Sequence, residues 1–206
     1  MGVDRKAHWE AVYASKAANE VSWYQQLPAV SLRLFAELHV KTDSSIIDVG
    51  GGDSSLVDAL LDRQYRYLTV LDLSGAALAR ARARLGPRAN GVNWLEADIT
   101  RSVLPENAYD VWHDRAVFHF LTGAEDRRHY VDAAATSVRP DGALIIATFA
   151  PNGPARCSGL DVRRYSGASL ARELGDAFAL ERSTVEVHST PSGAQQPFTY
   201  AVLRRS

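Results

Sequence analysis

The apolar residues of the chain change their spacing several times, and each change predicts a different kind of element. Helical spacing over residues 3–17, and again from Pro28 to about residue 38, predicts two helices. From residue 44 onward, short apolar runs predict strands at 45–49, 67–72, 92–96, 109–113 and 143–149. Helices are expected at 54–63, 74–85 and 124–138. Strands that alternate with helices predict an α/β fold, with a doubly wound and mostly parallel sheet and helices on both faces.

The end of the chain breaks this alternation. Residues 178–188 and 198–203 are both strand-like, and the segment Thr190–Gly193 between them is too short for a crossover helix. We therefore expect an antiparallel hairpin at the edge of the sheet, which gives seven strands in total. The chain carries no internal repeat and no linker, so a single domain over residues 1–206 is predicted, with two N-terminal helices added to the sheet.

Composition narrows the function classes. With 206 residues and a net charge of −1, the chain suits one α/β domain and lacks the basic stripe of a nucleic-acid binder. Arg80, Arg82, Arg84 and Arg88 are spaced as one solvated helix face. No secretory signal and no run of ~20 apolar residues is present, so we expect a cytoplasmic protein that does not contact membranes. Nothing in the sequence indicates an oligomeric state.

The sequence predicts no internal disulfide and no metal site, and it leaves a metal requirement open. Cys157 is the only cysteine, so the chain has no second thiol with which to form an internal disulfide or a thiolate cluster. The six histidines show no spacing typical of metal ligands.

A glycine-rich turn follows the first strand. It reads Asp48-Val49-Gly50-Gly51-Gly52-Asp53-Ser54. Glycines at a strand-to-helix turn let the backbone approach a ligand where a side chain would clash. A tight turn without a ligand is the alternative, because such motifs also occur by chance.

Acidic residues at the ends of the next two strands favour the ligand interpretation. Asp72 ends the second strand, a position where a carboxylate can accept hydrogen bonds from both hydroxyls of an adenosine ribose. This is compatible with NAD and with S-adenosylmethionine. After the third strand, Asp98 is placed to accept from an adenine amino group and Ile99 to pack on the ring.

The order of these motifs resembles class I S-adenosylmethionine-dependent methyltransferases over nearly the whole chain. It runs from Asp48-x-Gly50-x-Gly52 through Asp72, Asp98-Ile99 and Tyr109-Asp110-Val111 to Arg139-Pro140-Asp141-Gly142. The resemblance implies S-adenosyl-L-methionine as cofactor and S-adenosyl-L-homocysteine as product. It places Gly50 and Gly52 near the methionine part, Asp72 on the ribose, and Asp98 and Ile99 about the adenine. Ser54 replaces a third glycine that many members have, and Asp53 lies inside the loop.

The N-terminal segment adds to this resemblance. His8-Trp9-x-x-x-Tyr13 and Ser22-Trp23-Tyr24 resemble the entry helix and loop of small methyltransferases, including lysine methyltransferases and thiopurine-methyltransferase-like enzymes. A core stripe is the alternative for Trp9 and Tyr13. The resemblance implies a helical lid over residues 1–40, a cofactor-binding core over 44–150 and an acceptor-side segment over 151–206. The predicted cofactor-binding residues are Trp9, Tyr13, Trp23, Asp48, Gly50, Gly51, Gly52, Asp53, Ser54, Asp72, Leu73, Ser74, Asp98, Ile99, His113, Asp114 and Arg115.

The run Trp112–Phe120 is the densest group of functional side chains. Methyl transfer needs alignment of the reacting atoms and at most one proton acceptor. His113 and Asp114 are the predicted catalytic residues, as proton acceptor or orienter, and Phe118 and Phe120 are predicted pocket walls. In the alternative, Asp114 and Arg115 form an ion pair that fixes the loop, and His119 is a core histidine.

A second cluster follows the fifth strand, over residues 152–165. Loops in such positions carry specificity. Cys157 is either a reactive thiol beside Arg156 or a buried apolar residue. The predicted substrate-binding residues are Tyr24, Phe118, Cys157, Tyr165 and His188.

Four functions remain open at this stage. Methyl transfer to a small acceptor through nitrogen or sulfur is favoured by the small size of the chain, and protein lysine methylation is the second candidate. An NAD-dependent oxidoreductase is disfavoured, because Ser55 stands where the last glycine of G-x-G-x-x-G belongs. A non-catalytic protein that only binds S-adenosylmethionine is the fourth.

Overall fold

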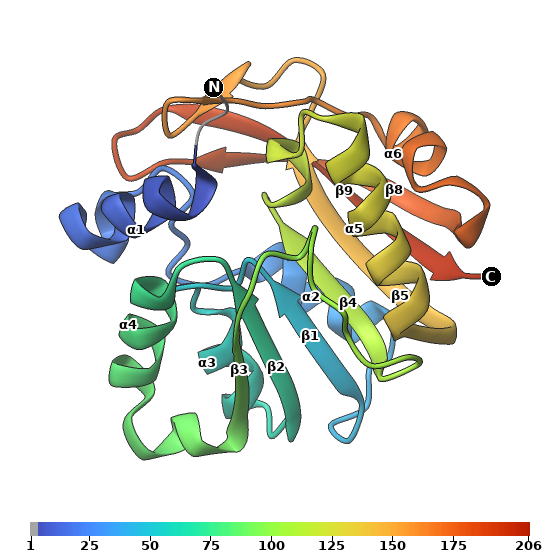
Figure 1. Cartoon of the computed structure of the whole chain (residues 1–206), viewed down its shortest axis with the longest axis horizontal. Helices are drawn as coiled ribbons and strands as arrows, with labels where there is room; N and C mark the ends of the chain where they lie inside the picture. The colour runs from blue at the N-terminus through green and yellow to red at the C-terminus, as the bar shows by residue number, and fades with distance from the viewer. Residues whose placement is uncertain (1–3) are drawn as a thin grey trace.

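One seven-stranded sheet organises the molecule (Figure 1). The computed structural model describes residues 4–206, so Val3 of the first predicted helix lies outside the described residues. The strand order is β3-β2-β1-β4-β5-β9-β8. The strands are β1 (Ser45–Val49), β2 (Tyr67–Asp72), β3 (Val92–Glu96), β4 (Tyr109–Arg115), β5 (Val138–Phe149), β8 (Phe178–Ser189) and β9 (Gln195–Arg205).

Strands β1 to β5 are parallel, and β9 and β8 pair antiparallel at one edge. The doubly wound sheet and its terminal hairpin are thereby confirmed. The parallel strands all end at one edge, which is the edge where ligands bind in open α/β sheets.

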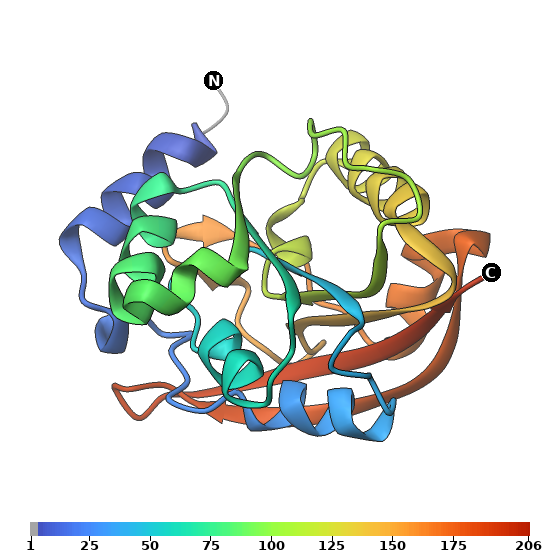
Figure 2. The same ribbon diagram turned by 90° about the horizontal axis from the view of Figure 1, so that it is seen from below.

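Helices cover both faces of the sheet, as Figure 2 shows for α2 and α5. The helices are α1 (Arg5–Ser15), α2 (Ala29–Glu37), α3 (Leu56–Asp62), α4 (Gly75–Leu85), α5 (Ala124–Ser137) and α6 (Gly167–Leu174). The two added N-terminal helices, α1 and α2, are confirmed. Ser74 caps α4 by accepting a hydrogen bond from the Ala77 backbone N–H, as its position before the Ala/Arg helix predicts.

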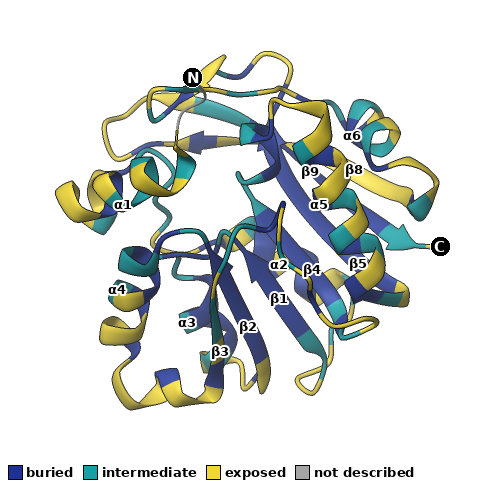
Figure 3. Ribbon diagram, in the orientation of Figure 1, coloured by how far each residue is buried: buried dark blue, intermediate teal, exposed yellow. Residues whose placement is uncertain are grey.

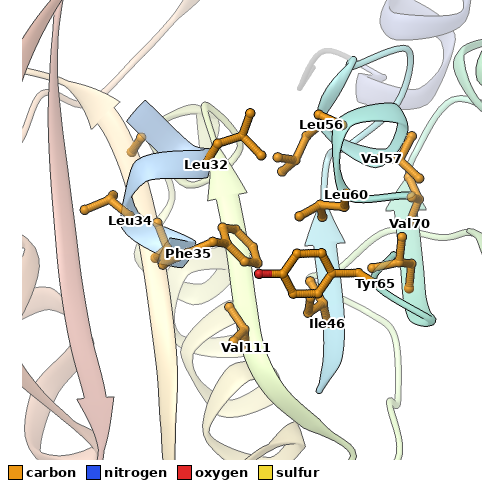
Figure 4. Close-up of a cluster of buried hydrophobic side chains, with 14 of the residues drawn as sticks. Leu32, Leu34, Phe35, Ile46, Leu56, Val57, Leu60, Tyr65, Val70 and Val111 are labelled. Atoms are coloured by element: carbon orange, nitrogen blue, oxygen red, sulfur yellow. The ribbon is translucent and has the colours of Figure 1, made fainter. Parts of the chain in front are cut away.

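Two apolar clusters, one on each face, fill the space between sheet and helices. Figure 3 shows the central strands buried and the outer faces of the helices exposed. In Figure 4, Phe35 of α2 lies beside Tyr65, between α2, β1 and α3. Because Phe35 is 1% exposed, truncation to alanine would cost about 3–5 kcal/mol.

The pleat of β4 sends alternate side chains to opposite faces. Val111 and His113 lie on the face that α2 covers, where Val111 joins the apolar cluster and His113 is hydrogen-bonded to Ser31. Trp112 and Asp114 lie on the opposite face and are hydrogen-bonded to Tyr130 of α5. This alternation decides which residues of the Trp112–Phe120 run reach the ligand edge.

Two details differ from the predicted elements. Residues 139–142 do not form a separate turn but lie within β5, where the register with β4 shifts and Asp141 takes φ 62°. A short ribbon of β6 (Arg156–Cys157) and β7 (Leu160–Asp161) forms in the predicted loop after β5.

Within residues 4–206, no helix combines the length and apolar character needed to cross a bilayer.

Candidate active site

A large cavity, here called the main cavity, lies along the carboxyl ends of the parallel strands. It encloses about 860 Å³, open space at its mouth included. Its aromatic cover comes from the N-terminal segment: the Trp9 ring of α1 lies 5.0 Å from Phe120 and 5.6 Å from Trp23 between centroids. A smaller side cavity lies next to it beside the glycine turn, and Tyr13, Trp23, Gly50 and Arg115 line both.

The glycine turn is built for close approach. Gly50 and Gly52 take φ of 69° and 40°, a conformation that favours glycine. A Cβ at Gly52 would lie 2.7 Å from Asp72 Oδ2 and 3.2 Å from the Tyr13 hydroxyl. The turn therefore leaves room for Asp72 only because residue 52 has no side chain.

One end of the main cavity, the acidic end, is formed by the ends of β2 and β3. Asp72, Leu73, Asp98 and Ile99 line it. Asp72 Oδ1 accepts from the Ser74 backbone N–H at 2.8 Å. Burial, reinforced by the nearby Asp48 and Glu10 carboxylates, raises the pKa of Asp72 to about 7.

Asp98 is held by its own loop and by the N-terminal helix. Its Oδ1 accepts from the Thr100 backbone N–H and hydroxyl, and Arg5 of α1 reaches Oδ2 at 3.4 Å. Arg5 also lines the cavity, so α1 is tied to the loop after β3.

The opposite end, the aromatic end, lies at β4, β5 and β9. Its members are Arg115, His119, Phe120, Phe149, Cys157, Gln196 and Phe198. Arg115 donates through Nε to the Tyr200 hydroxyl at 3.0 Å and through Nη1 to the Trp23 carbonyl at 2.8 Å. Its guanidinium lies 4.7 Å above the Phe198 ring.

The predicted catalytic residues His113 and Asp114 are not among the residues that line the main cavity. His113 is 2% exposed, with Nδ1 2.7 Å from Asp48 Oδ1 and Nε2 2.8 Å from Ser31 Oγ. Asp114 is fully buried and accepts from the backbone N–H groups of Val117 and Phe118 and from the Tyr130 hydroxyl. The hydrogen bonds of both side chains are therefore made within the protein, and they fix the end of β4. The alternative ion pair between Asp114 and Arg115 does not form either, since both bond elsewhere.

Four other predicted contact residues, Phe118, Tyr165, His188 and Ser74, are not among the residues that line the main cavity either. Phe118 packs on Tyr130 and Tyr165 in the core instead of lining the cavity, because β4 ends on the α5 face there. Tyr165 is buried with it. The His188 Nε2 bonds to the Ser22 carbonyl at 2.8 Å, so this ring supports the Ser22–Trp23 loop. Ser74 is the helix cap described above and does not reach the cavity.

Other predicted residues line one of the two cavities. Trp9, Tyr13, Trp23, Gly50, Asp72, Leu73, Asp98, Ile99, Arg115 and Cys157 line the main one. Tyr24, Asp48, Gly51, Asp53, Ser54 and His113 line the side one. Asp53 pairs there with Arg80 and Arg84, and Ser54 Oγ accepts from the Leu56 N–H at the start of α3.

The sequence interpretation missed Arg5, Phe149 and Phe198 as cavity residues and treated His119 only as a core histidine. His119 is indeed fully buried, yet it lines the main cavity. Nothing in the local pattern marks Phe149 or Phe198, because both are apolar positions of buried strands. Only the pairing of β5 with β9 brings their rings to 4.8 Å.

A family model described as a methyltransferase domain matches residues 47–146 of the chain. An uncharacterized methyltransferase of Mycobacterium bovis is 35% identical over 105 residues, which are 50% of this chain and 50% of that protein. A zebrafish (Danio rerio) eEF1A lysine and N-terminal methyltransferase is 24% identical over 119 residues, 58% of this chain and 17% of the relative. The matches thus span no more than about half the length of these curated relatives.

Two solved structures share the fold over most of their length. A S-adenosylmethionine-dependent methyltransferase from Anabaena variabilis superposes with a TM-score of 0.75 at 15% identity, over 100% of this chain and 96% of the other. The 1,6-didemethyltoxoflavin-N1-methyltransferase of Burkholderia thailandensis, which holds its substrate and S-adenosylhomocysteine, gives a TM-score of 0.69 at 20% identity over 98% and 84%.

The fold is therefore that of the class I methyltransferases. Residues 47–146 are similar to a methyltransferase domain, and the resemblance stated from the motifs is confirmed.

Proposed function

We propose that this protein transfers a methyl group from S-adenosylmethionine to a small acceptor through a nitrogen or sulfur atom. One observation carries the proposal. A single cavity joins an acidic end, next to the glycine turn, to an aromatic end with no acid among its described lining residues. The cofactor site and the acceptor site must lie in one continuous cavity, because methyl transfer is an in-line displacement in which the acceptor atom, the methyl carbon and the sulfur are aligned.

The residues of the acidic end fit an adenosyl cofactor. The Asp72 carboxylate would accept hydrogen bonds from the ribose hydroxyls, and Asp98 and Ile99 would border the adenine. Because Gly52 has no side chain, the Asp72 carboxylate keeps its position beside the turn. Gly50 lines both cavities, at the point where the methionine part of the cofactor would pass. When bound, the cofactor supplies an electrophilic methyl group on a positively charged sulfur.

The remaining residues bind, orient and exclude water. Trp9, Tyr13 and Trp23 close the cavity over the glycine turn, and their faces stabilise a cation by roughly 0.5–2 kcal/mol. Asp114 and His113 hold the β4 end rigid, so that Arg115 and Phe120 keep their places along the reaction path.

Calorimetric titration with S-adenosylmethionine, S-adenosylhomocysteine and NAD tests the cofactor. We expect both adenosyl ligands to bind and NAD not to bind. The Asp72→Ala variant should lose this binding, whereas Asp62→Ala, which removes an exposed carboxylate on α3, should keep it. Binding of NAD alone, or of none of the three ligands, contradicts the proposal.

Protein lysine methylation is a second candidate, because a zebrafish eEF1A lysine and N-terminal methyltransferase is similar over 58% of this chain. Incubation of a cell lysate with the protein and a tritium-labelled methyl donor distinguishes the two. Discrete labelled protein bands would favour lysine methylation, and an unlabelled gel with turnover of small acceptors would favour the first candidate.

A further inference from the structure

Three buried polar atoms at the aromatic end have no hydrogen-bond partner within residues 4–206. They are Arg115 Nη2, His119 Nε2 and Gln196 Oε1. All three residues line the main cavity. Because a buried polar atom without a partner loses its hydrogen bonds to water and gains none, three such atoms in one cavity indicate a ligand that satisfies them.

Two of the three atoms are hydrogen-bond donors. The Arg115 guanidinium is fixed through Nε by the Tyr200 hydroxyl and through Nη1 by the Trp23 carbonyl, which leaves Nη2 to donate elsewhere. His119 Nδ1 accepts from the Phe149 backbone N–H at 3.3 Å, so the neutral ring carries its proton on Nε2. Burial, with the Arg115 cation nearby, lowers the pKa of His119 to about 3, so this ring is neutral at physiological pH.

The third atom is an acceptor and lies beside the donors. An amide oxygen such as Gln196 Oε1 accepts hydrogen bonds and donates none. The two donor side chains gather at Phe198: the Arg115 guanidinium lies 4.7 Å above its ring, and the His119 ring lies 6.4 Å away between centroids. Gln196 precedes Phe198 by two residues on the same face of β9, which places their backbones about 7 Å apart. The site therefore offers two donors at one point and an acceptor next to them.

The charge around this end is balanced. Arg115 is the one cation among the described residues that line it. Glu186 of β8 does not line the cavity, but its carboxylate lies near Tyr200 and His188. Burial raises the pKa of Tyr200 and lowers that of His188, and on each pKa the Arg115 cation and the Glu186 carboxylate act in opposite directions. Glu186 therefore offsets the charge of Arg115, and the region does not select an anion.

The three atoms together discriminate between classes of polar group. A carboxylate has only acceptors, so it leaves Gln196 Oε1 without a donor, and an ammonium group has only donors and faces the Arg115 cation. A hydroxyl satisfies all three only if they meet at a single oxygen. A carboxamide has its acceptor and its donor on two neighbouring atoms. Its carbonyl oxygen has two lone pairs for the two donors, and its N–H groups supply a donor for Gln196.

We propose that the aromatic end binds an uncharged carboxamide group of the methyl acceptor. The carbonyl oxygen of this group accepts from Arg115 and His119, its N–H donates to Gln196, and the phenylalanine rings of this end enclose the apolar body of the acceptor. Because the lone pair of an amide nitrogen is delocalised into the carbonyl, the carboxamide positions the acceptor and the nucleophile lies elsewhere on the molecule. This inference rests on the proposed function and narrows the acceptor class.

Binding of inert aromatic probes tests the site without requiring turnover. The protein is first saturated with S-adenosylhomocysteine and then titrated with benzamide, acetophenone, benzoate or benzyl alcohol. Acetophenone replaces the NH₂ of benzamide by CH₃, benzoate replaces it by a charged oxygen, and benzyl alcohol offers a hydroxyl. We expect benzamide to bind about fivefold or more tightly than each of the other three.

Equal or tighter binding of any of the other three probes overturns the inference, and so does binding of none of the four to the saturated protein. Failure of S-adenosylhomocysteine to bind would instead contradict the proposed function.

A Gln196→Met variant removes the acceptor and keeps the length of the side chain. The preference for benzamide over acetophenone should fall to within about twofold, while the affinity for S-adenosylhomocysteine stays within about threefold. Gln195→Met is the matched control, because this exposed neighbour on β9 points to the opposite face and the preference should remain. An unchanged preference in Gln196→Met, or a loss of S-adenosylhomocysteine affinity in its place, overturns the inference.

A His119→Leu variant tests one of the donors separately. Benzamide and acetophenone share the carbonyl, so both should bind about threefold or more weakly while the preference for benzamide is kept. The exposed His129→Leu on α5 serves as the control, and retained S-adenosylhomocysteine affinity shows that the variant is folded. Unchanged binding of both probes, or loss of the preference for benzamide, overturns the assignment of the carbonyl to His119.

Discussion

The two ends of the main cavity are built in opposite ways. At the acidic end, Asp72 is the last residue of β2 and Asp98 lies two residues beyond β3, and each accepts a hydrogen bond from the backbone N–H two residues further along the chain. At the aromatic end, Arg115 bonds to residues 92 and 85 positions away, and its Nη2 has no partner. The first end is a local construction, and the second is assembled by tertiary structure. Contacts within one short segment suit the acidic end, which would bind the same cofactor in many proteins. Contacts between distant segments leave the aromatic end free to differ between proteins that use different acceptors.

The largest effect is expected at the glycine turn, which supports the acidic end. A Gly52→Ala substitution places a Cβ 2.7 Å from Asp72 Oδ2 and at φ 40°, so it should lower the affinity for S-adenosylhomocysteine by more than about a hundredfold. Calorimetry measures this. Gly91→Ala is the matched control, since no atom lies within 4 Å of its added Cβ. Equal binding by both variants would show that the turn does not shape the acidic end.

The charged Asp72 carboxylate should lower the stability of the folded protein and strengthen the binding of S-adenosylhomocysteine. Because burial raises its pKa to about 7, the folded protein holds a proton there that the unfolded chain releases near its ordinary value of 3.8. Stability is therefore lost as the pH rises from about 4 to about 7. At pH 8, Asp72→Asn should be more stable than the parent by about 1–3 kcal/mol, while its affinity for S-adenosylhomocysteine falls about 10–100-fold.

Denaturant titrations at pH 4 and pH 8 measure the stability of Asp72→Asn, and Asp62→Asn at an exposed carboxylate serves as the control. A stability difference that is the same at both pH values would contradict the raised pKa.

Asp114 should matter for stability. Its carboxylate accepts three hydrogen bonds, and an asparagine would turn an NH₂ group toward at least one N–H donor. We expect Asp114→Asn to destabilise the protein by about 1–3 kcal/mol in denaturant titrations at pH 8, compared with the exposed Asp132→Asn. Full stability with lost turnover would restore Asp114 as a catalytic residue.

The smallest effect is expected at Cys157 of the aromatic end. Because burial raises the pKa of its thiol to about 11, alkylation by iodoacetamide at pH 8 should be about a hundredfold slower than that of a free cysteine. Cys157→Ala should leave the affinity for S-adenosylhomocysteine within about twofold. Rapid alkylation of the folded protein, followed by mass spectrometry, would reveal a reactive thiol and a different electrostatic field at this end.

Periodicity and motif order determined the fold and the acidic end. The apolar runs at β1 to β5 predict buried parallel strands, and a residue at the end of such a strand faces the ligand edge. Asp72, Asp98 and the glycine turn were therefore placed from the sequence, because each depends on the strand directly before it. The alternation along the chain likewise predicted the terminal hairpin.

Tertiary structure alone decided the aromatic end and the roles of the β4 residues. The sequence places His113, Asp114 and Arg115 together, but the pleat directs Asp114 toward α5 and the other two toward the opposite face. Whether a polar side chain is occupied by a partner or left without one depends on Ser31, Tyr130 and Tyr200, which lie far away in the chain. The sequence therefore located the reactive run, and only packing separated the residues that hold it from those that face the cavity.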